Sequence, residues 1–411
     1  MERHIGIIGA GVAGLHLGLY LRQHGIDATI VTDRKPADIA KMRLQNTVAH
    51  HSITVEREKA LGINHWPDPD LYYGCHHHSF ETPQPLRFRG DFSKPGRAVD
   101  YRVYLPKLME DFENRGGTIE YRNFTADDIP ALASRFDLVV VSTGKGALGQ
   151  MFQHDAAQSP FDHPLRLLSV GLYTGVRKSR PNGVTLSVSP GHGELIEIPT
   201  LTFGGHSTAL LLENVPGGDL EELVRFRADD DPKGFLKLLL AKLEKHHPTI
   251  YDRIDTATFG LCQPQDLLQG SVVPTVRKTK VDLGDGKIAV AAGDVHCVVD
   301  PAMGQGANIA SFSAVTLGEE IVKDAAYDDH FIERVDRRRE ERVLGASRWT
   351  NFMLMPPTAE LFGLIIEMAG NPKLCNEFTM NFNYPERQWA HLASPARINA
   401  WIAESKVAAA A

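Results

Sequence analysis

Two glycine-containing loops, far apart in the chain, have residue types and spacings that suit the binding of a reactive cofactor. The first is residues 9–14, GAGVAG, between a short apolar strand and a helix with apolar spacing. In this GxGxxG pattern Gly9 permits a tight turn, Gly11 lets the backbone approach a pyrophosphate, and Gly14 lets the helix pack on the strand. The helix N-terminus then offers unpaired N–H groups to the phosphates. The loop predicts a dinucleotide site and does not distinguish NAD from FAD.

The elements around this loop support the prediction. Residues 27–34, DATIVTDR, form a second strand, so the segment reads as β–α–β, the opening unit of a parallel sheet. Asp33 ends that strand and could accept the ribose hydroxyls. The predicted cofactor contacts here are Gly9, Gly11, Ala13, Gly14, Asp33 and Arg34.

The second loop, residues 293–312, is GDVHCVVDPAMGQGANIASF. An NAD dehydrogenase has no obvious use for a Gly-Asp pair at the end of a late strand, whereas FAD is long enough to need two anchors. Asp294 could bind the ribityl hydroxyls, Gly304, Gly306 and Ala307 bring backbone against the flavin, and the helix from about Asn308 aims its N-terminus at the ring, favouring reduced flavin. The alternative is an ordinary connection that happens to contain glycine.

The rest of the chain predicts an α/β protein with a discontinuous Rossmann-type domain. Residues 165–225 alternate as strands of a mixed or antiparallel sheet, and the chain after about residue 330 is charged and helical. We expect an FAD-binding domain from residues 1–75, 95–165 and 270–330, an interleaved β-rich substrate domain from 76–94 and 166–269, and a C-terminal helical segment from 331–411.

Longer motifs then give a specific resemblance. GAGVAG with GDVHCVVDPAMGQGAN resembles the flavoprotein monooxygenases of the hydroxylase fold. GLHLGLYLRQH, RLQNTVAHHSITVERE, SPGHGELIEIPTL, RWTNF and NEFTMNFNYPERQW narrow it to the oxygenase component of the styrene monooxygenases, over nearly the whole chain.

That resemblance implies an FAD-dependent epoxidase of a two-component system. A separate NADH-dependent flavin reductase supplies reduced FAD, molecular oxygen gives a flavin C4a-hydroperoxide, and the distal oxygen goes to the vinyl group of an aryl alkene. The expected product is styrene oxide, usually the (S) enantiomer, and the expected assembly is a homodimer. The sister group, the indole monooxygenases, is the nearest alternative.

The resemblance also implies site residues. Arg43 and Arg102 match arginines near the FAD phosphates or ribityl chain, and Gly144 lies where single-component hydroxylases have Asp-Gly. Asn46 and Pro301 are the expected catalytic positions beside the flavin. The expected substrate pocket is Gln45, Thr47, Val48, His50, Tyr73, His76, Gly96, Ile196 and Ile198. Gln45 replaces a usual apolar residue and Gly96 a usual serine, which changes the pocket's shape.

Other functions fit the sequence less well. The run His76-His77-His78 lacks spaced partners for a metal, so no metal is expected. Ser207 in GHST is not a hydrolase elbow, and His192 with Glu194 reads as a turn and strand rather than an acid–base pair. A net charge of −7 gives no general attraction to nucleic acid, and no apolar run is long enough for a membrane span, so a cytoplasmic enzyme is expected. A self-sufficient NAD(P)H hydroxylase and a non-catalytic flavin-binding protein stay open as further alternatives.

Overall fold

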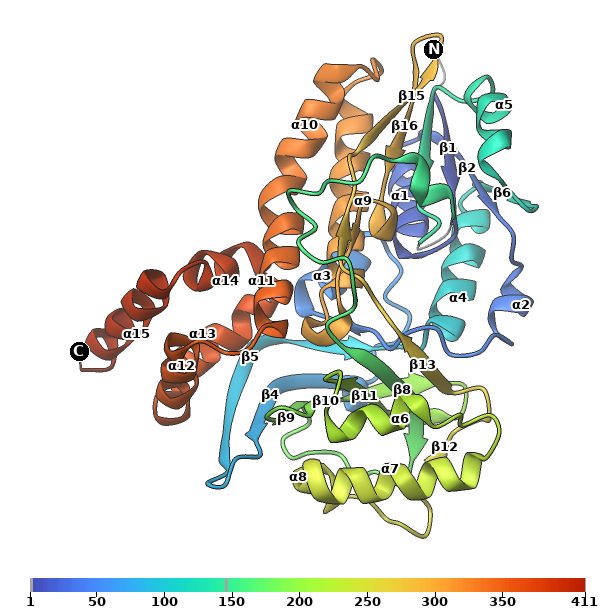
Figure 1. Ribbon diagram of the computed structural model, residues 1–411. Helices are drawn as coiled ribbons and strands as arrows, with labels where there is room; N and C mark the ends of the chain where they lie inside the picture. Colours follow the sequence, from blue (N-terminus) through green and yellow to red (C-terminus); the bar gives the residue numbers. More distant parts are fainter. Residues whose placement is uncertain (1–2, 145–146, 411) are drawn as a thin grey trace.

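The computed structural model describes residues 3–144 and 147–410. Residues 1–2, 145–146 and 411, which belong to the predicted domains and include Lys145 beside Gly144, lie outside the described residues. Figure 1 shows a first sheet with its helices above, a second sheet below, and a helical C-terminal arm at one side. The predicted fold class is thereby confirmed: an α/β dinucleotide-binding domain, a β-rich second unit and a helical C-terminal segment.

The first sheet is mainly parallel, as the buried apolar strands predicted. Its described strands follow the order β15-β16-β7-β1-β2-β6, and all neighbours are parallel except the edge pair β15–β16. The strands are β1 (His4–Ile8), β2 (Asp27–Thr32), β6 (Thr118–Tyr121), β7 (Leu138–Val141), β15 (Lys280–Gly284) and β16 (Lys287–Ala291). Every residue of β7 is buried, which fits a central strand covered on both faces.

Helices cover both faces of this sheet. On one face α1 (Val12–Gln23) packs between α4 (Tyr101–Asn114) and α9 (Gly306–Lys323), and Leu15, Leu108 and Leu317 share one core there. On the other face α5 (Ile129–Ala133) closes a second core. The shorter elements are α2 (Pro36–Ile39) and α3 (Ser52–Ala60), with the two-stranded pair β14 (Thr275–Val276) and β17 (Cys297–Val298).

The second sheet is mostly antiparallel. Its path is β12-β8-β11-β10-β9-β4-β5-β3, with β13 also paired to β8. Its described strands are β3 (Ala49–His50), β4 (Tyr72–Phe80), β5 (Leu86–Ala98), β8 (Leu167–Thr174), β9 (Val184–Ser189), β10 (Gly193–Thr202), β11 (Gly205–Asn214), β12 (Gly260–Leu261) and β13 (Leu267–Ser271). Parts of β3, β4 and β5 thus come from ranges assigned above to the FAD-binding domain, and the domain boundaries themselves stay a prediction.

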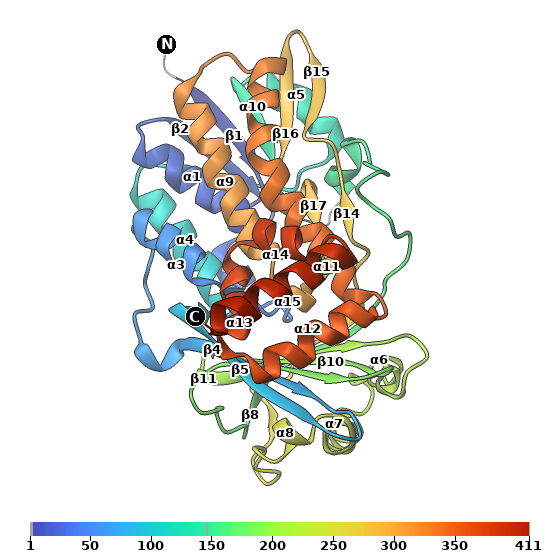
Figure 2. The same cartoon turned by 90° about the vertical axis from the view of Figure 1, so that its left-hand side faces the viewer.

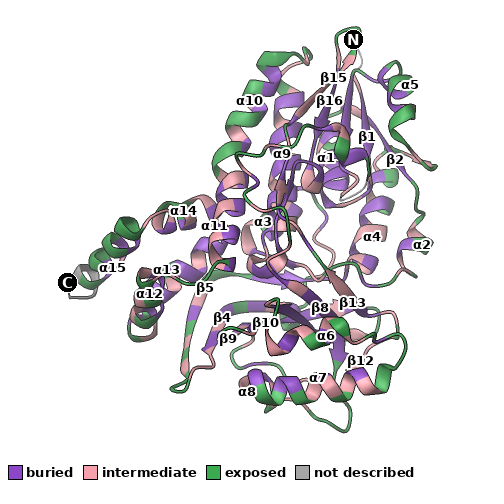
Figure 3. Cartoon of the chain, viewed as in Figure 1, coloured by how far each residue is buried: buried purple, intermediate pink, exposed green. Residues whose placement is uncertain are grey.

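The two faces of the second sheet have different partners. Side chains alternate along β11, so that Leu210 and Leu212 pack against α7 while Leu211 faces the first sheet. The covering helices are α6 (Glu222–Arg225), α7 (Pro232–His246) and α8 (Pro248–Tyr251). Figure 3 shows the outer side of α7 exposed and the strands above it buried. The face with Leu211 is therefore free to line a site between the two sheets.

The C-terminal helices form an arm that closes the side of the molecule. They are α10 (Asp329–Arg339), α11 (Gly345–Leu354), α12 (Ala359–Gly370), α13 (Pro372–Met380), α14 (Pro385–Leu392) and α15 (Pro395–Ala410), with a π-helical turn at Glu340–Leu344 before α11. Figure 2, in which the arm faces the viewer, shows α12 and α13 above the strands β4 and β5. Trp349 and Trp401 lie in the core of this arm.

None of the described helices is by itself long and apolar enough to cross a bilayer. Two segments, Asp329–Leu354 and Ala359–Gly370, meet the length and composition criteria only together and are bent by 95° at the break between them.

Candidate active site

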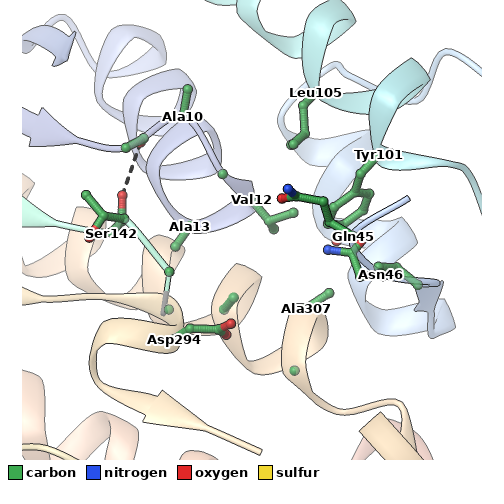
Figure 4. A pocket seen from close by; sticks show the side chains of 18 of the residues that line it. Ala10, Val12, Ala13, Gln45, Asn46, Tyr101, Leu105, Ser142, Asp294 and Ala307 are labelled. Atoms are coloured by element: carbon green, nitrogen blue, oxygen red, sulfur yellow. Dashed lines mark hydrogen bonds between the residues drawn. The ribbon is translucent and has the colours of Figure 1, made fainter. Parts of the chain in front are cut away.

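One cavity of about 1030 Å³ lies between the two sheets and receives both glycine loops. Figure 4 shows the first loop, the segment with Gln45 and Asn46, and the second loop with Asp294 and Ala307 around the same space. At its other end the wall is apolar and comes from the second sheet. The aliphatic residues there are Leu168, Val170, Leu211, Leu268 and Val272.

The first loop has the geometry that its three glycines predict. Gly9 has a φ of +108°, and a Cβ there would lie 2.6 Å from the carbonyl oxygen of Ser142. A Cβ on Gly14 would lie 2.0 Å from the carbonyl oxygen of Gly9, so Gly14 does not line the cavity and serves the helix–strand packing. A Cβ on Gly11 would meet only the Ser142 oxygen, at 4.0 Å. The backbone at Gly11 is thus open towards the cavity.

Two helix N-termini face this cavity without a side-chain cap. Helix α1 begins after Gly11 and α9 begins after Gln305, and neither helix has a side-chain hydrogen bond that caps its first N–H groups. Gly11 and Gly306 both line the cavity. Uncapped N–H groups with a partial positive charge bind anions. The cavity can therefore hold a negatively charged group at each of two separate places.

Polar groups in the wall also suit a dinucleotide. Asp33 and Arg34 lie at the cavity end formed by β2, and Gly144 lines the same region. The hydroxyl oxygen of Thr143 is buried and has no hydrogen-bond partner among the described residues. Asp294, beside Gly293 with its φ of +60°, lines the wall at the second loop. Ala13, Gly304, Gly306 and Ala307, all predicted cofactor contacts, line it as well.

Asn308 does not line the cavity but fixes its second loop. Its side-chain oxygen accepts hydrogen bonds from the His51 backbone N–H at 3.0 Å and the Thr54 hydroxyl at 2.7 Å. Its amide group donates to the carbonyl oxygens of Ala49 at 2.9 Å and Gly304 at 2.7 Å. Three of these four bonds join α9 to the segment after Asn46, and the fourth, to Gly304, holds the second loop itself.

The two predicted cofactor arginines are placed differently. Arg102 lines the cavity, but its guanidinium is held between Asp100 and Asp266, with a nitrogen 2.6 Å from each carboxylate. Arg43 does not line the cavity. It pairs with Asp229 at 2.8 Å on the surface, where about half of its side chain is exposed. Tertiary ion pairs, invisible in the local sequence, thus engage both side chains.

The predicted substrate residues separate into two groups. Gln45, Asn46, Thr47 and Val48 line the cavity, as does Pro301 on the opposite loop. The structure does not bring the others to the wall: His50, Tyr73, His76, Gly96, Ile196 and Ile198. They are buried behind it. The aliphatic wall from β8 and β11 and the ring of Tyr101 were not predicted, because the sequence does not show which strand of a sheet lies nearest the site.

His50 belongs to a buried network behind Tyr101. Its Nδ1 donates to Glu58 at 2.6 Å and its Nε2 is hydrogen-bonded to the Tyr101 hydroxyl at 2.9 Å. Glu58 also accepts from the Tyr104 hydroxyl at 2.8 Å and pairs with Arg97. Burial raises the pKa of Glu58, but His50 and Arg97 outweigh it and lower this pKa to about 2. The network therefore holds an ionised carboxylate in the interior.

His76 is a packed core residue among aromatic rings. Its ring centroid lies 4.7 Å from that of Phe92 and 4.4 Å from that of Phe382, both edge to face. Burial lowers its pKa well below the ordinary value. Among residues 3–144 and 147–410, no group of three or more His, Cys, Asp or Glu residues is arranged to hold a metal ion.

Gly96 lies directly against Tyr73, and this contact explains the missing serine. The two residues are paired across β4 and β5, and a Cβ on Gly96 would lie 2.5 Å from the Tyr73 hydroxyl oxygen. Tyr73 is fully buried. We expect the Gly96→Ser variant to lose about 1–3 kcal/mol of unfolding free energy through overpacking. Denaturant unfolding measures this loss.

Gly74→Ser is the matched control, because Gly74 lies beside Tyr73 on the paired strand β4 and a Cβ there would meet nothing within 4 Å. Adding Tyr73→Phe to Gly96→Ser removes the clashing hydroxyl and should restore part of the stability. Equal unfolding midpoints for Gly96→Ser and the wild type would contradict this account.

Comparison with known proteins agrees with the motifs. Residues 144–253 match the family model described as "Styrene monooxygenase A putative substrate binding domain". The chain is 51% identical over 407 residues to styrene monooxygenase StyA of Pseudomonas fluorescens, and 50% identical over 410 residues to styrene monooxygenase StyA of a Pseudomonas species. Each comparison covers 98% of this chain and 98% of the relative.

Solved structures with low sequence identity share the fold. The flavin-dependent brominase Bmp2 superposes with a TM-score of 0.71 at 14% identity, over 98% of this chain and 99% of that chain. A flavoprotein/dehydrogenase from Cytophaga hutchinsonii superposes with a TM-score of 0.68 at 13% identity, over 99% of this chain and 100% of that chain. The resemblance found in the sequence motifs is confirmed by the full-length relatives. This chain belongs to the styrene monooxygenase family.

Proposed function

We propose that this protein epoxidises styrene and related aryl alkenes to styrene oxide, with the (S) enantiomer as the main product. It uses molecular oxygen and reduced FAD made by a separate NADH-dependent flavin reductase. The observation that carries the proposal is the single cavity that joins both glycine loops to an apolar wall. The chain is 50% and 51% identical to two styrene monooxygenases, and this similarity supports styrene as the substrate.

We propose that FAD lies along this cavity, which both glycine loops line. The backbone at Gly11 and the N-terminus of α1 would hold the pyrophosphate, and Asp33 would hold the ribose. Asp294 would accept the ribityl hydroxyls and the N-terminus of α9, after Gly304, would lie at the ring. A helix N-terminus favours negative charge by roughly 0.3–2 kcal/mol, which suits the anionic reduced ring. Reduced FAD, when bound, would supply the two electrons that activate molecular oxygen, so that one oxygen atom goes to the alkene and the other leaves as water.

The protein's own residues then bind and orient the alkene. Leu168, Val170 and Leu211 give an apolar surface that takes an aryl group out of water. Asn46 and Pro301 both line the cavity, on two different loops, where they would confine the vinyl group beside the ring. Gln45, in place of an apolar residue, puts an amide in the cavity wall, which Tyr101 also lines. The substrate preference between styrene and indole depends on this part of the site.

Product analysis tests the proposal. Purified protein is mixed with FAD, NADH, a generic flavin reductase, catalase and either styrene or indole, and the products are separated by chiral chromatography. We expect the mixture with styrene to give (S)-styrene oxide, and we expect no styrene oxide when the protein has been heat-denatured. Negligible styrene oxide together with strong indole turnover would overturn the proposal in favour of an indole monooxygenase.

Two further mixtures separate the remaining alternatives. With NADH but no reductase we expect no flavin reduction, and reduction by this chain alone would make it a self-sufficient hydroxylase. Reduced protein that only releases peroxide, with neither alkene oxidised, would leave a flavin-binding role. The homodimer and the cytoplasmic location stay predictions from the family resemblance.

A further inference from the structure

A buried carboxyl group stands directly behind the turn that carries Pro301. Asp300 is fully buried, and its Oδ1 accepts a hydrogen bond from the backbone N–H of Ala302 at 3.0 Å. This bond caps the short 3-10 turn η6 (Pro301–Met303), whose first residue lines the cavity. The position of Asp300 therefore determines how Pro301 meets the cavity.

The second oxygen of Asp300 faces another buried acid. Glu213 on β11 is fully buried and pairs across the sheet with Leu168, which lines the cavity. The two side chains are close enough for a hydrogen bond between them. Yet Oδ2 of Asp300 and both carboxyl oxygens of Glu213 have no N–H or O–H donor among the described residues. Two bare carboxylates could not satisfy each other, because both only accept.

The nearby cation is already engaged. Glu194 on β10 lies opposite Glu213 in the ladder, and Arg166 donates to both of its oxygens, at 2.7 and 2.8 Å. Arg166 also donates to the Leu354 carbonyl oxygen, at the end of α11. The titratable groups that act on the pair are thus Glu194 and Arg166, one carboxylate and one guanidinium that neutralise each other. No positive charge is left for two more anions.

Burial acts on both acids in the same direction. Burial, followed by the charges of Asp300 and Glu194, holds the pKa of Glu213 well above its ordinary value. Burial also raises the pKa of Asp300 to about 6. Because the two carboxyl groups lie together and their facing oxygens have no other donor in the part of the chain that the structure describes, they share one proton, and an O–H on Glu213 can donate to the Asp300 carboxylate.

We propose that Glu213 and Asp300 are a proton-sharing pair whose O–H···O bond joins β11 to the turn η6 and thereby holds Pro301 at the cavity. Glu213 is a positioning residue in this assignment, which rests on the proposed function only for the role of Pro301. When the pH rises far enough to remove the proton, two adjacent buried anions repel each other. The turn then moves away from β11, and the cavity loses its shape beside the flavin.

Infrared spectroscopy of the protein without flavin or substrate tests the pair itself. At neutral pH we expect the C=O stretching band of a buried carboxylic acid, which disappears in Glu213→Gln. Glu197→Gln is the matched control. Glu197, on β10, is buried like Glu213 but is paired with Arg253, so this substitution should leave the band in place. An identical band in the wild type and Glu213→Gln would overturn the proposal, whatever reaction the protein performs.

The pH dependence of styrene oxide formation tests the positioning role. Glu213→Gln keeps a neutral N–H donor towards Asp300, so its activity should resist alkaline pH better than that of the wild type. Glu213→Leu removes the donor and should lower epoxide formation at neutral pH on the order of 10-fold or more, with peroxide released instead. If Glu213→Leu matches the wild type in yield and pH profile, the positioning role is wrong. A complete failure to form epoxide in all three proteins would instead count against the proposed function.

Discussion

A Gly11→Val variant is expected to fold normally and to lose flavin binding. The space around Gly11 is open towards the cavity, so the new side chain meets the ligand rather than the protein. The variant would lose two hydrogen bonds to a charged phosphate, each worth about 1.5–3 kcal/mol. We therefore expect its affinity for reduced FAD to fall by at least about 100-fold. Anaerobic titration with reduced FAD measures this loss, and the thermal unfolding midpoint of the flavin-free protein measures the fold.

Gly14→Ala in the same loop should behave in the opposite way. Its Cβ would lie 2.0 Å from the Gly9 carbonyl oxygen and 2.7 Å from the Ser142 hydroxyl oxygen, so α1 must move away from β1. We expect the unfolding midpoint to fall together with flavin affinity. Gly260→Ala is the control for added side-chain volume, because nothing lies within 4 Å of that position. An unchanged affinity in Gly11→Val would show that the pyrophosphate does not lie on this loop.

Replacing Glu58 by glutamine is expected to cost about 3–5 kcal/mol of unfolding free energy. The reason is Arg97, whose side chain is only 1% exposed and which would keep its charge without a carboxylate. Denaturant unfolding at neutral pH measures the difference. Glu56→Gln on the same helix is the matched control. Glu56 is half exposed and paired with Lys59, so this substitution should change the unfolding free energy by no more than about 0.5 kcal/mol.

The same variant should change the response to acid. The folded pKa of Glu58, about 2, lies below its ordinary value of 4.5. Its stabilisation is therefore complete above the unfolded pKa and is lost as the pH falls through this window. The wild type should lose stability down to about pH 3 more steeply than Glu58→Gln. Parallel acid profiles would contradict the buried ion pair.

The sequence predicted the parts of this protein that local chemistry determines. The turn at Gly9 and the cavity position of Asp33 follow from a strand, a glycine loop and a helix that are adjacent in the chain. The second loop is equally local, since Asp294 and Gly306 lie within a few residues of their elements. Local patterns of apolar residues and glycines were therefore enough to predict the fold class and most of the cavity residues proposed to contact the cofactor.

The substrate wall could not be predicted because it depends on sheet order. Ile196 and Ile198 were placed on one strand face, and Ile196 does share its face with Leu211, its partner across the ladder. Only Leu211 reaches the cavity, because β11 lies one strand nearer than β10 to β8, whose Leu168 also lines it. Alternation gives the face of a strand but not its place in the sheet.

Glu58 was missed for a similar reason. In the polar segment VEREK it reads as one of several surface charges, and its neighbour Glu56 is one. Only tertiary packing brings Arg97 and His50, from the second sheet, onto this one carboxylate. The energies of such networks depend on residues far apart in the chain, and a single sequence does not pair them.

The strand order of the first sheet has a consequence for how the protein is made. Strand β7 ends at Val141, but its neighbour β16 begins only at Lys287, with the whole of β8 to β11 in between. During synthesis one edge of β7 therefore stays unpaired while more than a third of the chain is added. Unpaired edges of apolar strands attract other chains. We therefore expect the nascent chain, while this edge is unpaired, to be more prone to aggregation than the finished fold.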